Sequence, residues 1–147
     1  MNADDLRKTY ERLYGPFSGM GPEDVAIWLR YLSAGGGRNA PFSYNVRVGT
    51  GQPIPADSSR TLQAANYALT TKRIDVIWNE SQTVVICELK KRAGAVAIGQ
   101  LILYRDLYKA TFPTNREPKM LLITDQLQPD MIATLIENNI AYIEVGL

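Results

Sequence analysis

The sequence predicts an α/β fold in which a mixed sheet, with parallel and antiparallel strands, carries helices on both faces. The apolar segments 73–78 and 83–90 are separated by a few polar residues, which indicates two neighbouring antiparallel strands. After residue 92, helical and strand-like segments alternate, as is typical of parallel sheets. The 147 residues, of which 46% are apolar, are sufficient for one domain with a sizeable core.

Two helices are expected at the start of the chain. Residues 1–20 form an N-terminal extension, in which large apolar side chains recur at helical spacing: Leu6, Tyr10, Leu13 and Tyr14. The core is expected to span residues 22–145 and to open with a helix from 22 to about 34. Pro22 and the two acidic residues after it suit the first turn of a helix, and three glycines end it.

A strand, a loop and an ambiguous segment come next. Apolar and polar residues alternate over 42–48, which predicts a half-buried strand. Residues 49–60 are rich in Gly, Pro and Ser, so we expect a loop there. Residues 61–71 fit either a short helix or an irregular segment, and the pattern leaves both open.

The remaining elements complete the sheet. The longest predicted helix covers residues 93–112, where apolar side chains recur at three- or four-residue steps. A buried strand at 119–124, a helix at 129–139 and a last strand at 140–145 follow. The predicted order of the core is therefore αβββαβαβ.

Composition excludes several kinds of chemistry. The chain has no histidine, so Ser-His-Asp and Cys-His catalysis and imidazole metal ligands are excluded. A single cysteine, Cys87, allows no intramolecular disulfide, which fits a reducing, cytoplasmic setting. No run of about 18 apolar residues is present, so we expect no membrane span. The first residues lack a basic region followed by an apolar stretch, so we expect no signal peptide. An enzyme of this composition must use carboxylates, lysine, tyrosine or serine, or a cation held by oxygen ligands.

Charge is unevenly distributed, although the net charge is only +1. Residues 72–119 carry nine Lys or Arg against five Asp or Glu, and residues 120–147 carry four acids and no base. The middle of the chain therefore presents either a basic face or charges scattered over an ordinary soluble surface.

Three charged residues lie within the two predicted central strands: Asp75 in the first, and Glu88 and Lys90 in the second. Burying a charge without a partner costs several kcal/mol, so their presence in apolar segments indicates a site. If the hairpin turns at Glu80 and Ser81, Asp75 lies opposite Ile86 and diagonal to Glu88. Because side chains alternate along a strand, the three charged side chains then share one face of the sheet.

This set of groups suits metal-dependent hydrolysis of a phosphodiester. Two neighbouring carboxylates repel each other and tend to take up a proton, and a Mg²⁺ ion removes that penalty. Such an ion supplies Lewis acidity and an activated water, while a lysine orients that water or stabilises charge on a phosphate. The backbone carbonyl of Leu89 is a candidate for a further metal ligand. A salt-bridged set at a strand end is the structural alternative.

Asp75, followed after twelve residues by Glu88-Leu89-Lys90, resembles the signature of the PD-(D/E)XK nuclease superfamily, which has the restriction-endonuclease-like fold. The predicted order of elements over residues 22–145 is similar to that of this family. Gln100 with Tyr104 on the next helix resembles the Q-x-x-x-Y pattern of several branches. Ile74 stands where the motif's name has Pro, a common variation.

The resemblance implies roles for individual residues. Asp75 and Glu88 would bind Mg²⁺ or Mn²⁺, Lys90 would assist the attacking water, and Gln100 would support the site. Some members also use an acid on the first core helix, for which Glu23 is the first candidate and Glu11 the second.

The function expected from this resemblance is a DNA endonuclease, acting in repair, recombination, or a phage or mobile element. Contacts to DNA phosphates are expected from Lys91, Arg92 and Arg105, although exposed surface positions explain these residues equally well. The DNA could be branched or single-stranded, a homodimer is compatible with the chain, and an RNA substrate shares the chemistry. The alternative from another class is a structural or interaction module, such as a phage assembly component, that keeps the fold without the activity.

Overall fold

The structure, a computed structural model, describes residues 17, 19–37 and 40–146. The helix predicted near the N-terminus, together with Glu11, lies outside these residues. The helices are α2 (Pro22–Ser33), α3 (Arg60–Thr70), α4 (Ala95–Thr111), the 3-10 turn η1 (Pro129–Met131) and α5 (Ile132–Glu137). The strands are β1 (Ser43–Val48), β2 (Lys72–Glu80), β3 (Thr83–Lys90), β4 (Lys119–Thr124) and β5 (Ile140–Glu144).

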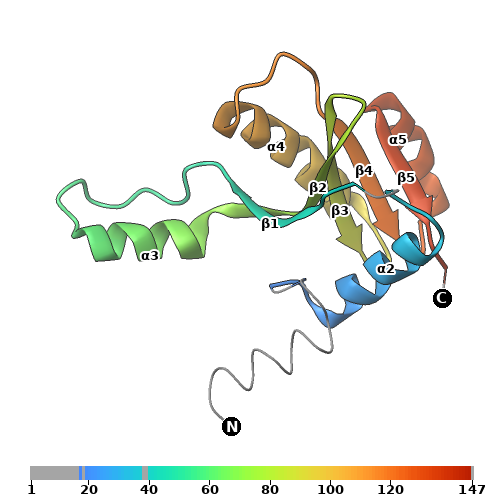
Figure 1. The fold of residues 1–147 in the computed structure, drawn as a ribbon, viewed down its shortest axis with the longest axis horizontal. Coiled ribbons are helices and arrows are strands. Elements are labelled where there is room, and N and C mark those ends of the chain that lie inside the picture. The colour runs from blue at the N-terminus through green and yellow to red at the C-terminus, as the bar shows by residue number, and fades with distance from the viewer. Residues whose placement is uncertain (1–16, 18, 38–39, 147) are drawn as a thin grey trace, which may run out of the picture.

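The five strands form one mixed sheet in the order β1-β2-β3-β4-β5 (Figure 1). β1, β2 and β3 pair antiparallel, whereas β3, β4 and β5 pair parallel. The predicted mixed α/β architecture is thus confirmed. β3 is the central strand, so a polar side chain at its end is enclosed by strands on both sides.

The order of elements differs from the prediction at one place, because α3 separates β1 from β2. The segment that the sequence left open is helical, and Ser59 caps its start by accepting a hydrogen bond from the Leu62 N–H at 3.1 Å. α3 and the loop before it project away from the sheet (Figure 1).

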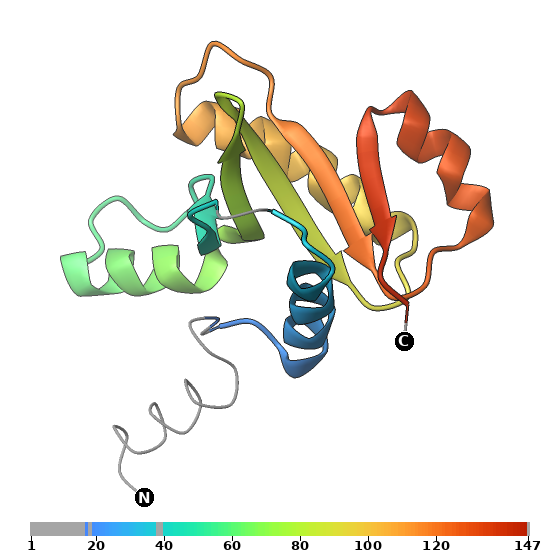
Figure 2. The same ribbon diagram turned by 45° about the vertical axis from the view of Figure 1, so that its right-hand side comes forward.

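Two hydrophobic cores cover the two faces of the sheet, as the prediction of helices on both sides requires. The first core is formed by α2 against β2, β3 and β4, and it is rich in aromatic residues. The second core is formed by α4 and α5 against the opposite face. Figure 2 shows α2 and α4 on opposite sides of the strands. No helix of the described part of the chain is long and apolar enough to cross a membrane.

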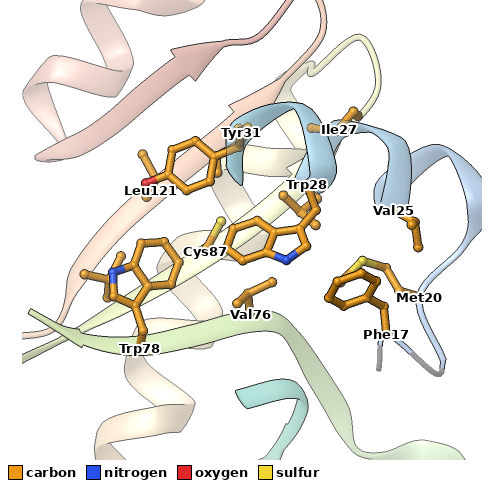
Figure 3. Packing of buried hydrophobic residues seen from close by; sticks show 13 residues of the cluster. Phe17, Met20, Val25, Ile27, Trp28, Tyr31, Val76, Trp78, Cys87 and Leu121 are labelled. Carbon is orange, nitrogen blue, oxygen red and sulfur yellow. The ribbon is translucent and has the colours of Figure 1, made fainter. Parts of the chain in front are cut away.

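Trp28 anchors α2 to the sheet. It is completely buried, and Figure 3 shows its ring beside that of Trp78. The centroid of its ring lies 5.9 Å from that of Trp78 and 5.0 Å from that of Phe42. Its indole N–H donates a hydrogen bond to the Tyr44 hydroxyl at 3.2 Å. This packing fixes the position of α2 relative to β2, which matters for the acidic residues in the first turn of the helix.

Replacing Trp28 with alanine is expected to lower the free energy of unfolding by about 3–5 kcal/mol, because it empties a large buried site. Urea denaturation measures the change. Leu29→Ala on the same helix is the control, because Leu29 is 44% exposed and its loss should cost less than about 1 kcal/mol. Equal losses in the two variants would contradict this view of the core.

Candidate active site

β2 and β3 separate at Asp75. Their register runs from Glu80 opposite Thr83 to Val76 opposite Cys87, and the pairing stops there. Where the next backbone hydrogen bond between the two strands would form, the Leu89 N–H instead donates to a carboxylate oxygen of Asp75 at 2.8 Å. The Asp75 side chain thus replaces a backbone acceptor at the point where the two strands diverge.

This register corrects the predicted one by two residues. The hairpin turns at Ser81 and Gln82, both with positive φ (49° and 67°), rather than at Glu80 and Ser81. A two-residue turn of this kind matches the twist of the flanking strands. Continued past the last pair, the register sets Asp75 directly opposite Glu88 instead of diagonal to it, so the carboxyl groups are closer than expected.

The alternation of side chains along β2 also breaks at this point. Val76 and Trp78 contribute to the first core, whereas Ile74 packs with Val48 and Ile86 in the second. Strict alternation would have placed Ile74 with Val76. The pairing of β2 with β3 ends at this change of face, next to the two acidic side chains.

Glu88 is the most confined charged group of the site. It is only 5% exposed, and its Oε2 atom is buried without a hydrogen-bond partner in the described structure. Its neighbours along β3, Cys87 and Leu89, point into the first core, and Glu88 therefore faces the α4 side of the sheet. An unpaired buried carboxylate oxygen is costly, so this atom calls for a ligand or a proton.

The two carboxyl groups lie close enough that each affects the titration of the other. Burial raises the pKa of Glu88, and the adjacent charge of Asp75 raises it further. Burial also raises the pKa of Asp75, and the hydrogen bond from Leu89 partly offsets that effect. Near neutral pH, the pair without a cation therefore retains a proton, which a divalent cation would replace.

Lys90 ends β3 beside these groups. Its positive charge lowers the pKa of Asp75, Glu88 and Asp24, against the raising effect of burial. The Asp–Glu–Lys set predicted from the sequence is thus brought together at one end of the sheet, although the paired geometry differs from the one expected.

The first turn of α2 brings Asp24, rather than Glu23, to this site. The side chain of Glu23 is 67% exposed and forms an ion pair with Lys91 at 3.2 Å. Asp24 is half-buried, burial raises its pKa, and its charge raises the pKa of both Asp75 and Glu88. The sequence carries a signal for this, since Asp24 precedes the buried Trp28 and Tyr31 by four and seven residues and so shares their helix face.

α4 contributes Gln100 and Tyr104. The Gln100 amide donates to the Tyr104 hydroxyl at 3.4 Å, and the amide oxygen of Gln100 is buried without a partner. Tyr104 is 7% exposed, and burial followed by the charges of Glu88 and Asp75 raises its pKa. These interactions place the pair on the Glu88 side of the sheet, where two unpartnered oxygens, Glu88 Oε2 and Gln100 Oε1, remain available to a ligand.

Among the described residues, no three His, Cys, Asp or Glu side chains converge closely enough to enclose a metal ion by themselves. Mg²⁺ does not require such a cage, because it is commonly held by one or two carboxylates and retains several waters. The orphaned oxygen of Glu88 beside Asp75 fits that mode. Leu89 fixes Asp75 through its N–H, and its carbonyl is left as a proposed ligand.

The predicted phosphate-binding residues differ in their surroundings. Lys91 pairs with Glu23, and Arg92 is exposed, with a positive φ of 50° and its N–H donating to Asp125 at 2.7 Å. The guanidinium of Arg105 faces Asp106 at 3.0 Å and Glu117 at 3.7 Å, so acidic groups offset its charge. Of the three, Arg92 has a side chain for which the described structure records no ion pair.

Asp125, which sequence reasoning missed, organises the loop after β3. It is 5% exposed just after β4, and it accepts the Arg92 N–H. The neighbouring hydroxyl of Thr124 accepts the Ala93 N–H at 3.1 Å. Together they hold the residues that follow Lys90. In the sequence, an acidic residue directly after a predicted buried strand could have indicated this role.

Comparison with known proteins gives a fold but no family. No protein-family model and no curated protein matches the chain. The crystal structure of protein AF1548, of unknown function, is similar with a TM-score of 0.51 and 12% identity, over 82% of this chain and 56% of that one. The crystal structure of a repair endonuclease from Pyrococcus abyssi is similar with a TM-score of 0.46 and 16% identity, over 71% of this chain and 39% of that one.

The chain therefore spans 56% of the length of the first of these proteins and 39% of the length of the second. At such identities, the similarity to AF1548 shows a shared fold and does not assign an activity. The likeness to the endonuclease has a TM-score below 0.5 and assigns neither a fold nor an activity.

The buried carboxyl pair predicts a pH-dependent stability in the absence of metal. The pKa of Glu88 is raised from 4.5 to about 9 in the folded protein, so the folded state holds this proton more tightly than the unfolded chain. The free energy of unfolding in EDTA should therefore fall as pH rises from about 5 to about 9. We expect Glu88→Gln to reduce that fall by more than about 1.4 kcal/mol, the equivalent of one pKa unit.

Urea denaturation at a series of pH values tests this expectation. Glu80→Gln is the matched control, since Glu80 lies exposed at the other end of the same hairpin and should leave the slope unchanged. A wild-type slope identical to that of Glu88→Gln would show that Glu88 does not retain a proton in the folded protein.

Proposed function

We propose that this protein is a metal-dependent nuclease of the PD-(D/E)XK type, which hydrolyses phosphodiester bonds in DNA. The observation that carries the proposal is the pairing of the partly buried Asp75 with the buried Glu88, which has an unpartnered oxygen and feels the charge of Lys90 at the end of a central strand. A pair that must otherwise retain a proton is suited to a divalent cation. The sequence signature and the mixed sheet with helices on both faces are consistent with this superfamily.

Each residue has a distinct role in this proposal. Asp75 and Glu88 would hold Mg²⁺ or Mn²⁺, with the Leu89 carbonyl and the half-buried Asp24 as candidates to complete its surroundings. When bound, such an ion supplies Lewis acidity and lowers the pKa of a coordinated water. Lys90 would orient the attacking water or donate to a phosphate oxygen, because its positive charge acts on all three carboxyl groups.

Gln100 and Tyr104 act as positioning residues in this account. Their hydrogen bond holds the Gln100 amide with its oxygen unpartnered, and both side chains lie on the α4 side of the sheet. The amide could then accept a hydrogen bond from a water or from Lys90. Arg92 is the candidate for a phosphate contact, since its exposed position follows Lys90 by two residues.

The substrate assigned by this proposal is DNA, cut within the strand rather than from an end. Branched or single-stranded DNA is as compatible with the site as a duplex, because the described chain has no separate element for reading sequence. A role in repair, recombination or a mobile element would follow from such an activity.

Cleavage of supercoiled, linear, single-stranded and branched DNA tests the activity. Wild-type protein should cut at least one of these with Mg²⁺ or Mn²⁺ and none with EDTA. Asp75→Asn, Glu88→Gln and Lys90→Met should each lower the rate by about 10²-fold or more, as expected when charge stabilisation or acid–base assistance is removed. Folding of each variant is checked by circular dichroism.

Neighbouring residues provide matched controls. Glu80→Gln and Glu23→Gln should retain the wild-type rate, since both acids are exposed and pair with Lys119 and Lys91 rather than with the site. Asp24→Asn should lower it. Cutting that persists in EDTA, or that survives Glu88→Gln, would overturn the proposal. A folded wild type that binds no metal and cuts no DNA would instead indicate an interaction module that keeps the fold.

A further inference from the structure

The arm formed by the loop 49–59 and helix α3 has no role in the candidate site, yet its conformation is well defined. One face of α3 binds the loop: the Asn66 amide donates to the Gln52 carbonyl at 2.8 Å, and the Gln52 N–H donates to the Thr70 hydroxyl at 2.7 Å. The Gln63 amide donates to the Ser58 carbonyl at 2.8 Å. At the base, Arg47 donates to the carbonyl of Ala68. The arm is therefore a preformed unit.

The opposite face of α3 is apolar and uncovered. Leu62 is 53% exposed and Leu69 is 84% exposed, with Ala65 between them on the same face. No side chain of α3 is buried, and no helix or strand of the described chain packs extensively against it. Helices of this length are marginal in water on their own, so an 11-residue helix in this position gains stability from a partner.

The charge of the arm indicates which partner it takes. Residues 61–71 contain no charged side chain, and over residues 49–71 Asp57 and Arg60 cancel each other. A surface that binds nucleic acid would carry Lys or Arg here, because phosphate contacts dominate such binding. A neutral, leucine-bearing surface is instead typical of one buried against protein.

The spacing along α3 is self-complementary. Leu62, Ala65 and Leu69 follow the three- and four-residue steps of a coiled-coil seam. If two copies of α3 pack antiparallel about a two-fold axis, Leu62 of one copy lies beside Leu69 of the other, and the small Ala65 lies near the axis. A two-fold axis of this kind generates a closed, symmetric interface.

The base of the arm offers further area to such an interface. A cavity of about 190 Å³ lies there, lined by Gly49, Thr70, Leu103 and Leu107 among others, and Leu103 of α4 is 44% exposed. In an antiparallel pair, the start of α3 in each copy lies beside the base of the other arm. This matters because stable interfaces bury about 1,200–2,000 Å², more than two short helices alone supply.

We propose that α3 is the dimerisation element of this protein and packs antiparallel against α3 of a second copy. The arm joins β2 at Lys72, three residues before Asp75, so the two-fold axis would relate two candidate sites through the bases of the arms. The proposal does not depend on nuclease activity, since it rests on the exposed apolar face and on its symmetry.

Sedimentation velocity of the full chain tests the proposal. We expect a species of twice the 16.4 kDa chain mass for the wild type, and a monomer for the double variant Leu62→Asp, Leu69→Asp. Ile136→Asp is the matched control, because Ile136 is 62% exposed on α5 and should leave the dimer intact. Circular dichroism verifies that the double variant keeps its folded core.

Cross-linking tests the geometry with a small substitution that keeps both leucines of the apolar face. Ala65→Cys should form a disulfide-linked dimer on oxidation, whereas Gln63→Cys, on the face that binds the loop, should not; Cys87 is buried and does not interfere. A monomeric wild type, a dimer unaffected by the double substitution, or equal cross-linking at both positions would overturn the proposal. So would a monomer whose DNA binding is lost in the double variant, since that would assign this face to nucleic acid.

Discussion

The interaction on which the site depends is the close approach of two carboxyl groups, the buried Glu88 and the partly buried Asp75. By itself this contact is unfavourable, because burial and mutual repulsion both oppose ionisation. The surrounding structure compensates in specific ways. Leu89 donates its N–H to Asp75, and Lys90 supplies a positive charge. One oxygen of Glu88 still has no partner in the described structure, and a bound cation would satisfy it.

The fold creates this contact by ending the pairing of two strands. β2 and β3 are in register up to Val76 and Cys87, and the next residue of β2 turns its carboxylate toward the β3 backbone. β4 encloses β3 on its other side in parallel register, with Glu88 beside Leu122. The two helices that cover the sheet then contribute from opposite faces. Trp28 holds α2 so that Asp24 lies near the carboxyl pair. On the other face, α4 contributes Gln100 and Tyr104.

Much of this arrangement was predictable from the sequence, because it follows from local patterns. Alternating or continuous apolar segments identified the strands, and the charges inside them identified Asp75, Glu88 and Lys90. The register was not predictable to the residue, since the expected turn and the observed turn both consist of polar residues, and only the positive φ at Ser81 and Gln82 distinguishes them. Asp24 and Glu23 are adjacent acids, and only the packing of Trp28 decides which one faces the site. Asp125 acts through tertiary contacts that no short pattern records.

Helix α3 shows another limit of sequence reasoning. Its secondary structure was ambiguous because its large apolar residues are only Leu62, Tyr67 and Leu69, and most of its stabilising contacts are made with the preceding loop. Whether it packs against a second copy depends on surfaces far apart in the sequence. The site and the arm are therefore separate features of one chain. They are connected at β2, which runs from the base of the arm to the carboxyl pair.

The central claim, that the buried carboxyl pair is a cation site, is tested most directly by Mn²⁺ binding, measured by electron paramagnetic resonance without any substrate. The account predicts one bound Mn²⁺ per chain, displaced by Mg²⁺, and at least about tenfold weaker binding in Glu88→Gln, equivalent to about 1.4 kcal/mol. Binding of equal affinity in the wild type and in Glu88→Gln, or no binding by folded wild type, would contradict it.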